Sequence, residues 1–126
     1  MNFLDSAKTA AALQLAGHSI CGAEEEADIV VVNSCTVTAK AEKESQKEAL
    51  SAGKKEKLVA VFGCSIRMHY DIWKEKYPDF LLFKTENEFL HHFGADKNDL
   101  DFPLHDRTRT PIAIQTGCDN ACTFCI

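Results

Sequence analysis

The sequence has no long apolar run, and none of its hydrophobic stretches approaches the roughly 18 residues of a membrane-spanning helix. Its start, Met1–Asp5, has neither the basic residues nor the apolar stretch of a signal peptide. These absences predict a cytoplasmic location without a membrane partner. Cytosolic thiols stay reduced, so clustered cysteines there more often bind metal or react than form disulfides.

Basic residues are also scarce. The 126 residues include 14 Lys and Arg against 19 Asp and Glu, which gives a formal net charge of −5. An acidic chain is a poor electrostatic match for nucleic acid, because nucleic acid attracts clustered Lys and Arg. If the chain belongs to an enzyme that acts on nucleic acid, most of the phosphate contacts should come from residues outside it.

Segments with helical and strand patterns alternate along the chain. The two continuous apolar runs, Ile29–Val32 and Leu58–Phe62, indicate strands that are buried on both faces, which is typical of a parallel sheet under helices. The fold class is therefore α/β, an open and mostly parallel sheet with flanking helices. The predicted helices span 3–16, 38–52, 69–76 and 85–93, and the further predicted strands span 80–83 and 111–115.

Three of the six cysteines form a C-x3-C-x2-C pattern near the end of the chain: Cys118, Cys122 and Cys125, with Phe124 before the third. Three thiolates on one short loop can bind three irons of a 4Fe–4S cluster and leave the fourth iron open to a cofactor. Structural zinc sites usually need four ligands, and His105 lies far upstream. The loop thus favours an iron–sulfur site, with zinc or inert thiols as the alternatives.

Cys35 and Cys64 each follow directly after a predicted buried strand. The carboxyl ends of neighbouring parallel strands form the ligand crevice of open α/β sheets, so these two thiols are candidate metal ligands at one site. Free cysteine also packs as a small buried hydrophobe, which is the competing interpretation. Cys21 precedes the first predicted strand and has no partner at ligand spacing, so we expect a structural role for it.

Two pairs of ring side chains are weaker candidates for function. His91 and His92 are adjacent in a predicted helix, where successive side chains point about 100° apart, so they indicate a helix end rather than a metal site. Trp73 and Tyr77 have the i, i+4 spacing of one helix face, and we expect them to pack in the core rather than to stack on bases.

Three lysines, Lys40, Lys43 and Lys47, share one face of the predicted helix 38–52, where they are able to contact RNA phosphate. Acidic residues are interspersed with them in the sequence: Glu42, Glu44 and Glu48. Mixed charges of this kind are typical of a solvated helix surface, and this is the interpretation that the sequence favours.

Five segments together resemble one known family, the radical S-adenosylmethionine (SAM) methylthiotransferases. Gly117–Ile126 resembles the radical SAM cluster motif, and Arg107–Cys118 is similar to the entry into the barrel of these enzymes. Asn33–Thr38, with Ala41 and Glu44-Ser45, resembles the second N-terminal cysteine motif of the family. Val61–Cys64 resembles the third motif, and Asn2-x-x-Asp5-Ser6 resembles the end of the first.

The resemblance implies an N-terminal methylthiotransferase domain over 1–94, a linker over 95–107, and the first strand and cluster loop of a truncated radical SAM barrel over 108–126. The first strand of the N-terminal domain would be missing, and so would the cysteine of the first motif. In the family, that cysteine joins those that match Cys35 and Cys64 in holding an auxiliary 4Fe–4S cluster. Cys118, Cys122 and Cys125 would hold the cluster that binds SAM, with Phe124 packed beside it.

The implied activity is the addition of a methylthio group to C2 of a modified adenosine in tRNA. Thr36-Val37-Thr38 and Arg107-Thr108-Arg109 favour the MtaB type, which acts on N6-threonylcarbamoyladenosine, over the MiaB type, which acts on N6-isopentenyladenosine. The implied cofactors are two 4Fe–4S clusters and SAM, and the implied partners are tRNA and an electron donor such as flavodoxin or ferredoxin. We expect the isolated chain to be an inactive fragment. A non-catalytic iron–sulfur or zinc-binding module is the alternative.

Overall fold

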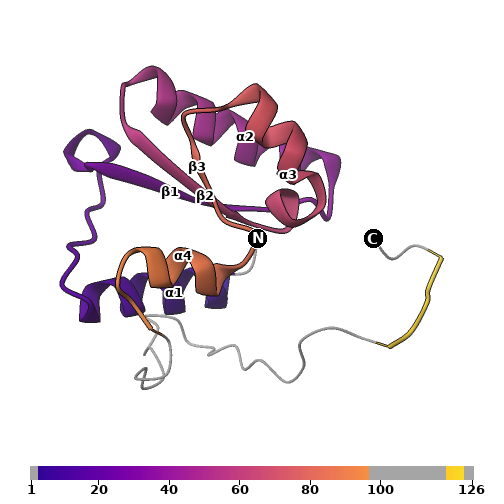
Figure 1. Cartoon of the computed structure of the whole chain (residues 1–126), viewed down its shortest axis with the longest axis horizontal. Helices are drawn as coiled ribbons and strands as arrows, with labels where there is room; N and C mark the ends of the chain where they lie inside the picture. The colour runs from indigo at the N-terminus through magenta and orange to yellow at the C-terminus, as the bar shows by residue number, and fades with distance from the viewer. Residues whose placement is uncertain (1–2, 97–118, 124–126) are drawn as a thin grey trace.

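The computed structural model describes residues 3–96 and 119–123 (Figure 1). The predicted alternation of helices and strands is confirmed over the first of these ranges. The elements in chain order are α1 (Phe3–Leu15), the 3-10 helix η1 (Glu24–Glu26), β1 (Ile29–Ser34), α2 (Ala39–Lys54), β2 (Leu58–Gly63), α3 (Cys64–Lys76), β3 (Leu81–Leu82) and α4 (Glu86–His92). The predicted strand 111–115 lies outside the described residues, and so does the predicted linker 95–107 beyond residue 96.

The strands of the described part form one parallel sheet in the order β1-β2-β3. In β1 and β2 the paired residues run from Ile29 opposite Leu58 to Ser34 opposite Gly63, so the two strands end level with one another. The predicted open, parallel α/β sheet is therefore confirmed. The level ends matter for function, because the residues that follow Ser34 and Gly63 begin at the same edge of the sheet.

Helices cover both faces of the sheet, with α2 and α3 on one side and α1 and α4 on the other (Figure 1). The first layer, the α2/α3 cluster, packs residues such as Ala49, Ile66 and Trp73 against Val59 and Val61 of β2. Because successive residues of a strand point to opposite faces, the alternate residues of β2 belong to the other layer. That layer, the α1/α4 cluster, is built around Ala60, Phe62, Leu13, Phe89 and Leu90.

Helix α3 begins earlier than the sequence pattern predicts. The sequence pattern predicts a helix over 69–76, whereas α3 starts at Cys64, directly after β2. The early turns are anchored by Ser65 and Ile66, which are both fully buried. A kink at His69 (φ −132°, ψ 35°) interrupts the helix and hides its full length from a search for continuous helical periodicity.

The remaining boundaries differ from the predictions by smaller amounts. The predicted strand 80–83 pairs only at Leu81 and Leu82, and Phe80 and Phe83 pack with the two opposite hydrophobic clusters instead. α4 ends at His92, as the helix-end interpretation of the two histidines predicts. Within the described part of the chain, no helix has the length and apolar character to cross a membrane.

Candidate functional site

Cys35 and Cys64 lie at matched positions at the carboxyl edge of the sheet. Each directly follows one member of the Ser34–Gly63 pair, which is the last pair of the β1–β2 ladder. Neither cysteine is in a disulfide; Cys35 is half-buried and Cys64 is exposed. The predicted placement of two thiols at the ends of neighbouring strands is confirmed, and the exposure of Cys64 argues against a role for it as a buried hydrophobe.

The loop that carries Cys35 is tied to helix α2 by hydrogen bonds. The backbone N–H of Cys35 donates to Oγ of Ser45 (3.2 Å), and this hydroxyl donates to the carbonyl of Ala41 (2.9 Å). Thr38 caps the helix, because its Oγ1 accepts from the backbone N–H of Ala41 (3.1 Å). Ser45 is buried, so its two hydrogen bonds hold the backbone at Cys35 against helix α2.

On the other side of the site, Gly63 brings β2 close to β1. Its φ of 106° lies in the region that favours glycine. A Cβ on Gly63 would lie 2.4 Å from the carbonyl oxygen of Ser34 and 2.7 Å from Oδ1 of Asn33. This close approach sets the spacing of the two backbones at the point where Cys35 and Cys64 begin. Ser34 adds to it, since its Oγ donates to the carbonyl of Phe62 (2.7 Å).

A buried polar chain holds the start of α3 against α2. The indole Nε1 of Trp73 donates to Oγ of Ser65 (3.0 Å), and Ser65 in turn donates to Oε1 of Glu42 (3.2 Å). Ser65 and Trp73 are 0% and 2% exposed, so the hydrogen bond between them is shielded from competition with water. These hydrogen bonds therefore fix Cys64, the residue before Ser65, relative to the helix that holds Cys35.

The first turns of α1 reach the same edge. Nδ2 of Asn33 donates to Oγ of Ser6 (3.2 Å), which connects the end of β1 to α1. Segments around Ser6, Cys35 and Cys64, which are far apart in the sequence, thus meet at one place. Sequence motifs identify all three segments, but the contacts of Ser6, Ser45 and Ser65 are not predictable from sequence, because isolated serines carry no pattern that reveals a tertiary partner.

The thiols at this edge are suitable donors for iron or zinc, since both metals accept cysteine thiolate ligands. In residues 3–96 and 119–123, however, no three His, Cys, Asp or Glu side chains gather as a metal-binding group. The edge thus supplies two neighbouring thiols. Of the predicted SAM-cluster loop, Cys122 is described and exposed, whereas Cys118, Phe124 and Cys125 lie outside the described residues.

Trp73, Tyr77, His92 and Cys21 supply no ligand at this edge in the described part of the chain. Trp73 and Tyr77 pack in the α2/α3 cluster with ring centroids 5.3 Å apart, which confirms their predicted core role. His92 is in the last turn of α4, and its ring contacts that of Phe83 (5.1 Å). Cys21 is exposed in the segment before β1, where its thiol contacts the carbonyl of Ala23 (3.5 Å).

The opposite, amino edge of the sheet carries an ion-pair cluster. Lys55 lies 2.8 Å from a carboxylate oxygen of Glu24 and 3.4 Å from one of Glu25. The pKa of Lys55 is raised above its ordinary 10.5, mainly by the hydrogen bond to Glu24. Backbone hydrogen bonds, followed by the hydrogen bond from Lys55, lower the pKa of Glu25 below its ordinary 4.5. These contacts join the segment before β1 to the one before β2.

Several known proteins are similar to this chain in sequence. Relatives include the probable threonylcarbamoyladenosine tRNA methylthiotransferase of Pyrococcus abyssi, which is 35% identical over 98% of this chain and 33% of the relative. The tRNA-2-methylthio-N(6)-dimethylallyladenosine synthase of Dictyoglomus thermophilum is 29% identical over 100% and 34%. The ribosomal protein uS12 methylthiotransferase RimO of Aquifex aeolicus is 30% identical over 98% and 30%.

The chain spans about a third of the length of these curated relatives. No solved structure gives a significant match. Residues 1–83 match the model of the family described as Uncharacterized protein family UPF0004, a range that includes both thiols of the carboxyl edge. The chain therefore belongs to the UPF0004 family, the N-terminal domain of the methylthiotransferases.

Proposed function

We propose that this chain is part of a radical SAM methylthiotransferase that adds a methylthio group to C2 of a modified adenosine in tRNA, with N6-threonylcarbamoyladenosine as the favoured substrate. The observation that carries the proposal is the placement of Cys35 and Cys64 side by side at the carboxyl edge, within the region that matches the family. Two thiols that directly follow the last pair of neighbouring strands suit a shared metal cluster better than they suit separate structural roles.

The cysteines take two different roles in this proposal. Cys35 and Cys64 are ligands of an auxiliary 4Fe–4S cluster, whose third cysteine is not among the described residues. Cys118, Cys122 and Cys125 hold the cluster that binds SAM. When bound, the clusters and SAM supply the one-electron chemistry that allows a sulfur group to replace hydrogen at an unactivated carbon. A flavodoxin or ferredoxin is the proposed electron donor.

The protein's own contribution at the carboxyl edge is to position the thiols before any ligand arrives. Ser45 fixes the backbone of Cys35, and the Trp73–Ser65–Glu42 hydrogen bonds fix the start of α3, where Cys64 lies. A site whose ligands are already in place loses less conformational entropy on binding than one that must be assembled. The exposure of Cys64 leaves this edge open to the rest of the enzyme and to its substrate.

The choice among substrates rests on short motifs. Relatives of this chain carry names that include tRNA threonylcarbamoyladenosine, tRNA dimethylallyladenosine and ribosomal protein uS12 as substrates. Thr38, one of the residues that favours the first branch, is also the N-cap of α2, and a cap role is independent of substrate. The preference for threonylcarbamoyladenosine therefore depends mainly on the motif Arg107-Thr108-Arg109. The isopentenyladenosine branch is the second candidate.

The test uses the intact protein that contains this chain, expressed in a bacterial strain that lacks methylthiolated tRNA. Nucleosides from digested tRNA are then analysed by mass spectrometry. We expect the methylthio derivative of threonylcarbamoyladenosine to appear with the wild type and to be lost with Cys122→Ala or Cys35→Ala. The matched control is Cys21→Ala, which removes an exposed thiol away from the edge and should leave the product unchanged.

Each other result contradicts part of the proposal. A methylthio group on isopentenyladenosine would assign the protein to the second branch. Anaerobic purification adds a metal analysis, in which the proposal expects roughly four irons and four sulfides for each cluster. Zinc without acid-labile sulfide, together with unmodified tRNA, would overturn the enzyme assignment in favour of a zinc-binding module.

A further inference from the structure

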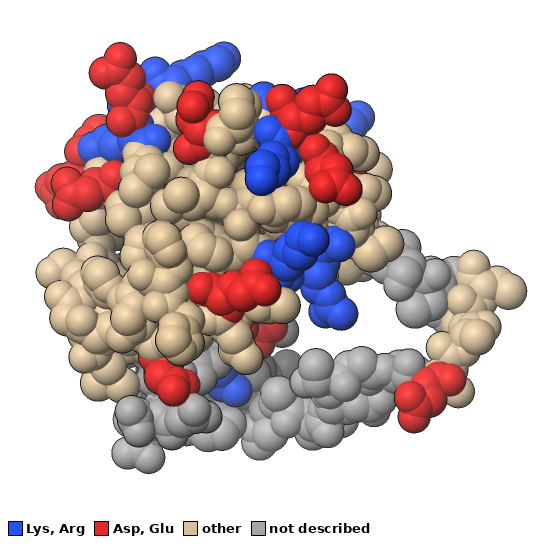
Figure 2. All heavy atoms as spheres, in the orientation of Figure 1, with Lys and Arg blue, Asp and Glu red and all other residues tan. Residues whose placement is uncertain are grey.

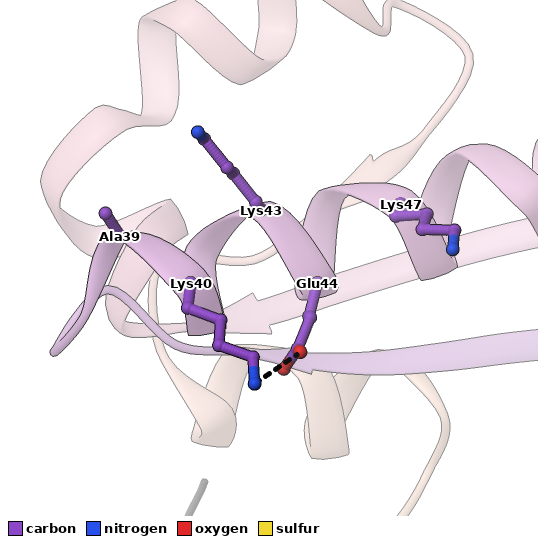
Figure 3. Close-up of a pocket in the computed structure, with 5 residues that line it drawn as sticks. All are labelled: Ala39, Lys40, Lys43, Glu44 and Lys47. Carbon is purple, nitrogen blue, oxygen red and sulfur yellow. Dashed lines mark ion pairs between the residues drawn. The ribbon is translucent and has the colours of Figure 1, made fainter.

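The exposed face of α2 carries three lysines around a shallow hollow of about 400 Å³. Lys40, Lys43 and Lys47 line it together with Ala39 and Glu44 (Figure 3). Their spacing of three and four residues puts the lysines along one side of the helix. The three span about 10 Å along the helix axis at a rise of about 1.5 Å per residue. We call this surface the lysine face.

The structure separates charges that the sequence intermixes. Glu42 does not belong to the lysine face, because it is only half-exposed and accepts a hydrogen bond from the buried Ser65. Glu48 does not line the hollow either. Glu44 is thus the acidic residue of this surface, and it pairs with Lys40 at 3.9 Å (Figure 3). Of the three glutamates that are interspersed with the lysines in the sequence, only Glu44 lines the hollow with them, so the positive charges of this surface are balanced less than the sequence indicates.

Lys43 and Lys47 are exposed and have no ion-pair partner in residues 3–96 and 119–123. Figure 3 shows Lys43 extending away from the Lys40–Glu44 pair. Across the space-filling view, acidic and basic side chains are otherwise interspersed over the helical layers (Figure 2). Three lysines against one glutamate make the lysine face locally positive on a chain whose net charge is −5.

The lysine face begins next to the candidate site. α2 starts four residues after Cys35, and Lys40 lies in its first turn. Cations near a helix N-terminus are disfavoured by the helix dipole, a cost that the exposed ion pair of Lys40 with Glu44 offsets only in part. A positive surface beside a proposed tRNA-modifying site is suited to the RNA backbone, since lysine binds phosphate as a flexible point charge.

We propose that the lysine face binds the phosphate backbone of the tRNA substrate next to the carboxyl edge. This inference rests on the proposed function and adds a contact surface on the N-terminal domain itself. Lysine–phosphate contacts carry no sequence information, so this surface would hold the tRNA in position while other parts of the enzyme recognise the target base.

The experiment measures binding of fluorescently labelled bulk tRNA to the intact protein by anisotropy over a series of KCl concentrations. The double variant Lys43→Glu/Lys47→Glu should bind at least roughly tenfold more weakly at low salt. The slope of the logarithm of its binding constant against the logarithm of the KCl concentration should fall in magnitude by roughly one for each lysine. The matched control is Lys74→Glu/Lys76→Glu in the last turn of α3, at the opposite end of the sheet. It makes the same change in charge and should leave affinity and slope at wild-type values.

The outcomes separate this inference from the proposed function. If the wild type methylthiolates tRNA and the Lys43→Glu/Lys47→Glu variant binds tRNA with unchanged affinity and slope, the inference fails and the function stands. If the wild type leaves tRNA unmodified and instead modifies a ribosomal protein, the proposed tRNA function fails and the inference fails with it. If the Lys74→Glu/Lys76→Glu control loses as much tRNA affinity as the Lys43→Glu/Lys47→Glu variant, the loss comes from the change in net charge, and the inference is also overturned. Matching thermal denaturation curves establish that the variants fold.

Discussion

At Gly63 the backbone passes from strand to helix within one residue. Its φ of 106° and its close approach to Ser34 leave no room for a side chain, and Cys64 follows immediately. The position of one candidate ligand therefore depends on the absence of a Cβ in the residue before it. Ser45 does the corresponding work for Cys35 through a single hydroxyl that both accepts and donates a hydrogen bond.

Replacing Gly63 with alanine should destabilise the protein by more than about 3 kcal/mol, because the strained φ and the overlap with Ser34 add to one another. Urea denaturation followed by circular dichroism measures the change. Gly22→Ala is the matched control: Gly22 has ordinary φ and open space around it, so its replacement should change stability by less than about 0.5 kcal/mol. Equal stabilities for the two variants would contradict the close packing at Gly63.

At this scale the sequence predicts some side chains and not others. The positions of Cys35 and Cys64 follow from strand patterns, because a buried parallel strand ends where its apolar run ends. The contacts of Ser65 could not be predicted, since they depend on how α2 and α3 approach one another across the sheet. The ligand roles of all five cysteines remain predictions.

Among the elements, the short ones depend most on local hydrogen bonds. α4 has seven residues, fewer than an isolated helix needs to be stable in water. It begins with a capping box in which Thr85 accepts from the backbone of Glu88 while the Glu88 side chain accepts from the backbone of Thr85. The sequence predicts this helix from the Thr85–Glu88 spacing. α3 was harder to predict, because its kink at His69 divides one helix into two short patterns.

Thr85→Ala should cost about 1 kcal/mol of stability, since it leaves the backbone N–H of Glu88 without its side-chain acceptor. Thermal or urea denaturation measures the loss. Thr85→Ser keeps the hydroxyl and should retain most of the stability. If serine proves as destabilising as alanine, the contribution of Thr85 comes from its methyl group and not from the cap.

In the whole molecule, β2 is the element that the two hydrophobic layers share. Val59 and Val61 pack into the α2/α3 cluster, and Ala60 and Phe62 pack into the α1/α4 cluster. All four residues are at most 3% exposed. In the described part of the sheet β2 is also the strand with neighbours on both sides. The α/β class and the parallel sheet can be predicted from the sequence pattern. The sequence does not predict that α1 covers one face of the sheet while α2 and α3 cover the other, because apolar periodicity does not say which face a helix covers.

This central position predicts the order of amide hydrogen exchange. The amides of β2 should exchange slowest, at rates close to those of global unfolding, because both layers must open to expose them. Amides of β1 should exchange faster, since Val31 in that strand is 39% exposed. Exchange followed by NMR or mass spectrometry tests the order. Equal protection of β1 and β2 would show that the sheet opens as one unit.

The separation of α1 from α4 along the chain has a consequence during protein synthesis. α1 emerges from the ribosome before its partner α4, which is made roughly 70 residues later and thus after roughly 4 to 14 seconds at usual translation rates. α2 and α3 are completed earlier and can pack against β1 and β2 before α4 is available to α1. The nascent chain thus builds one side of its sheet before the other, and the apolar side of α1 is available to a chaperone during the interval.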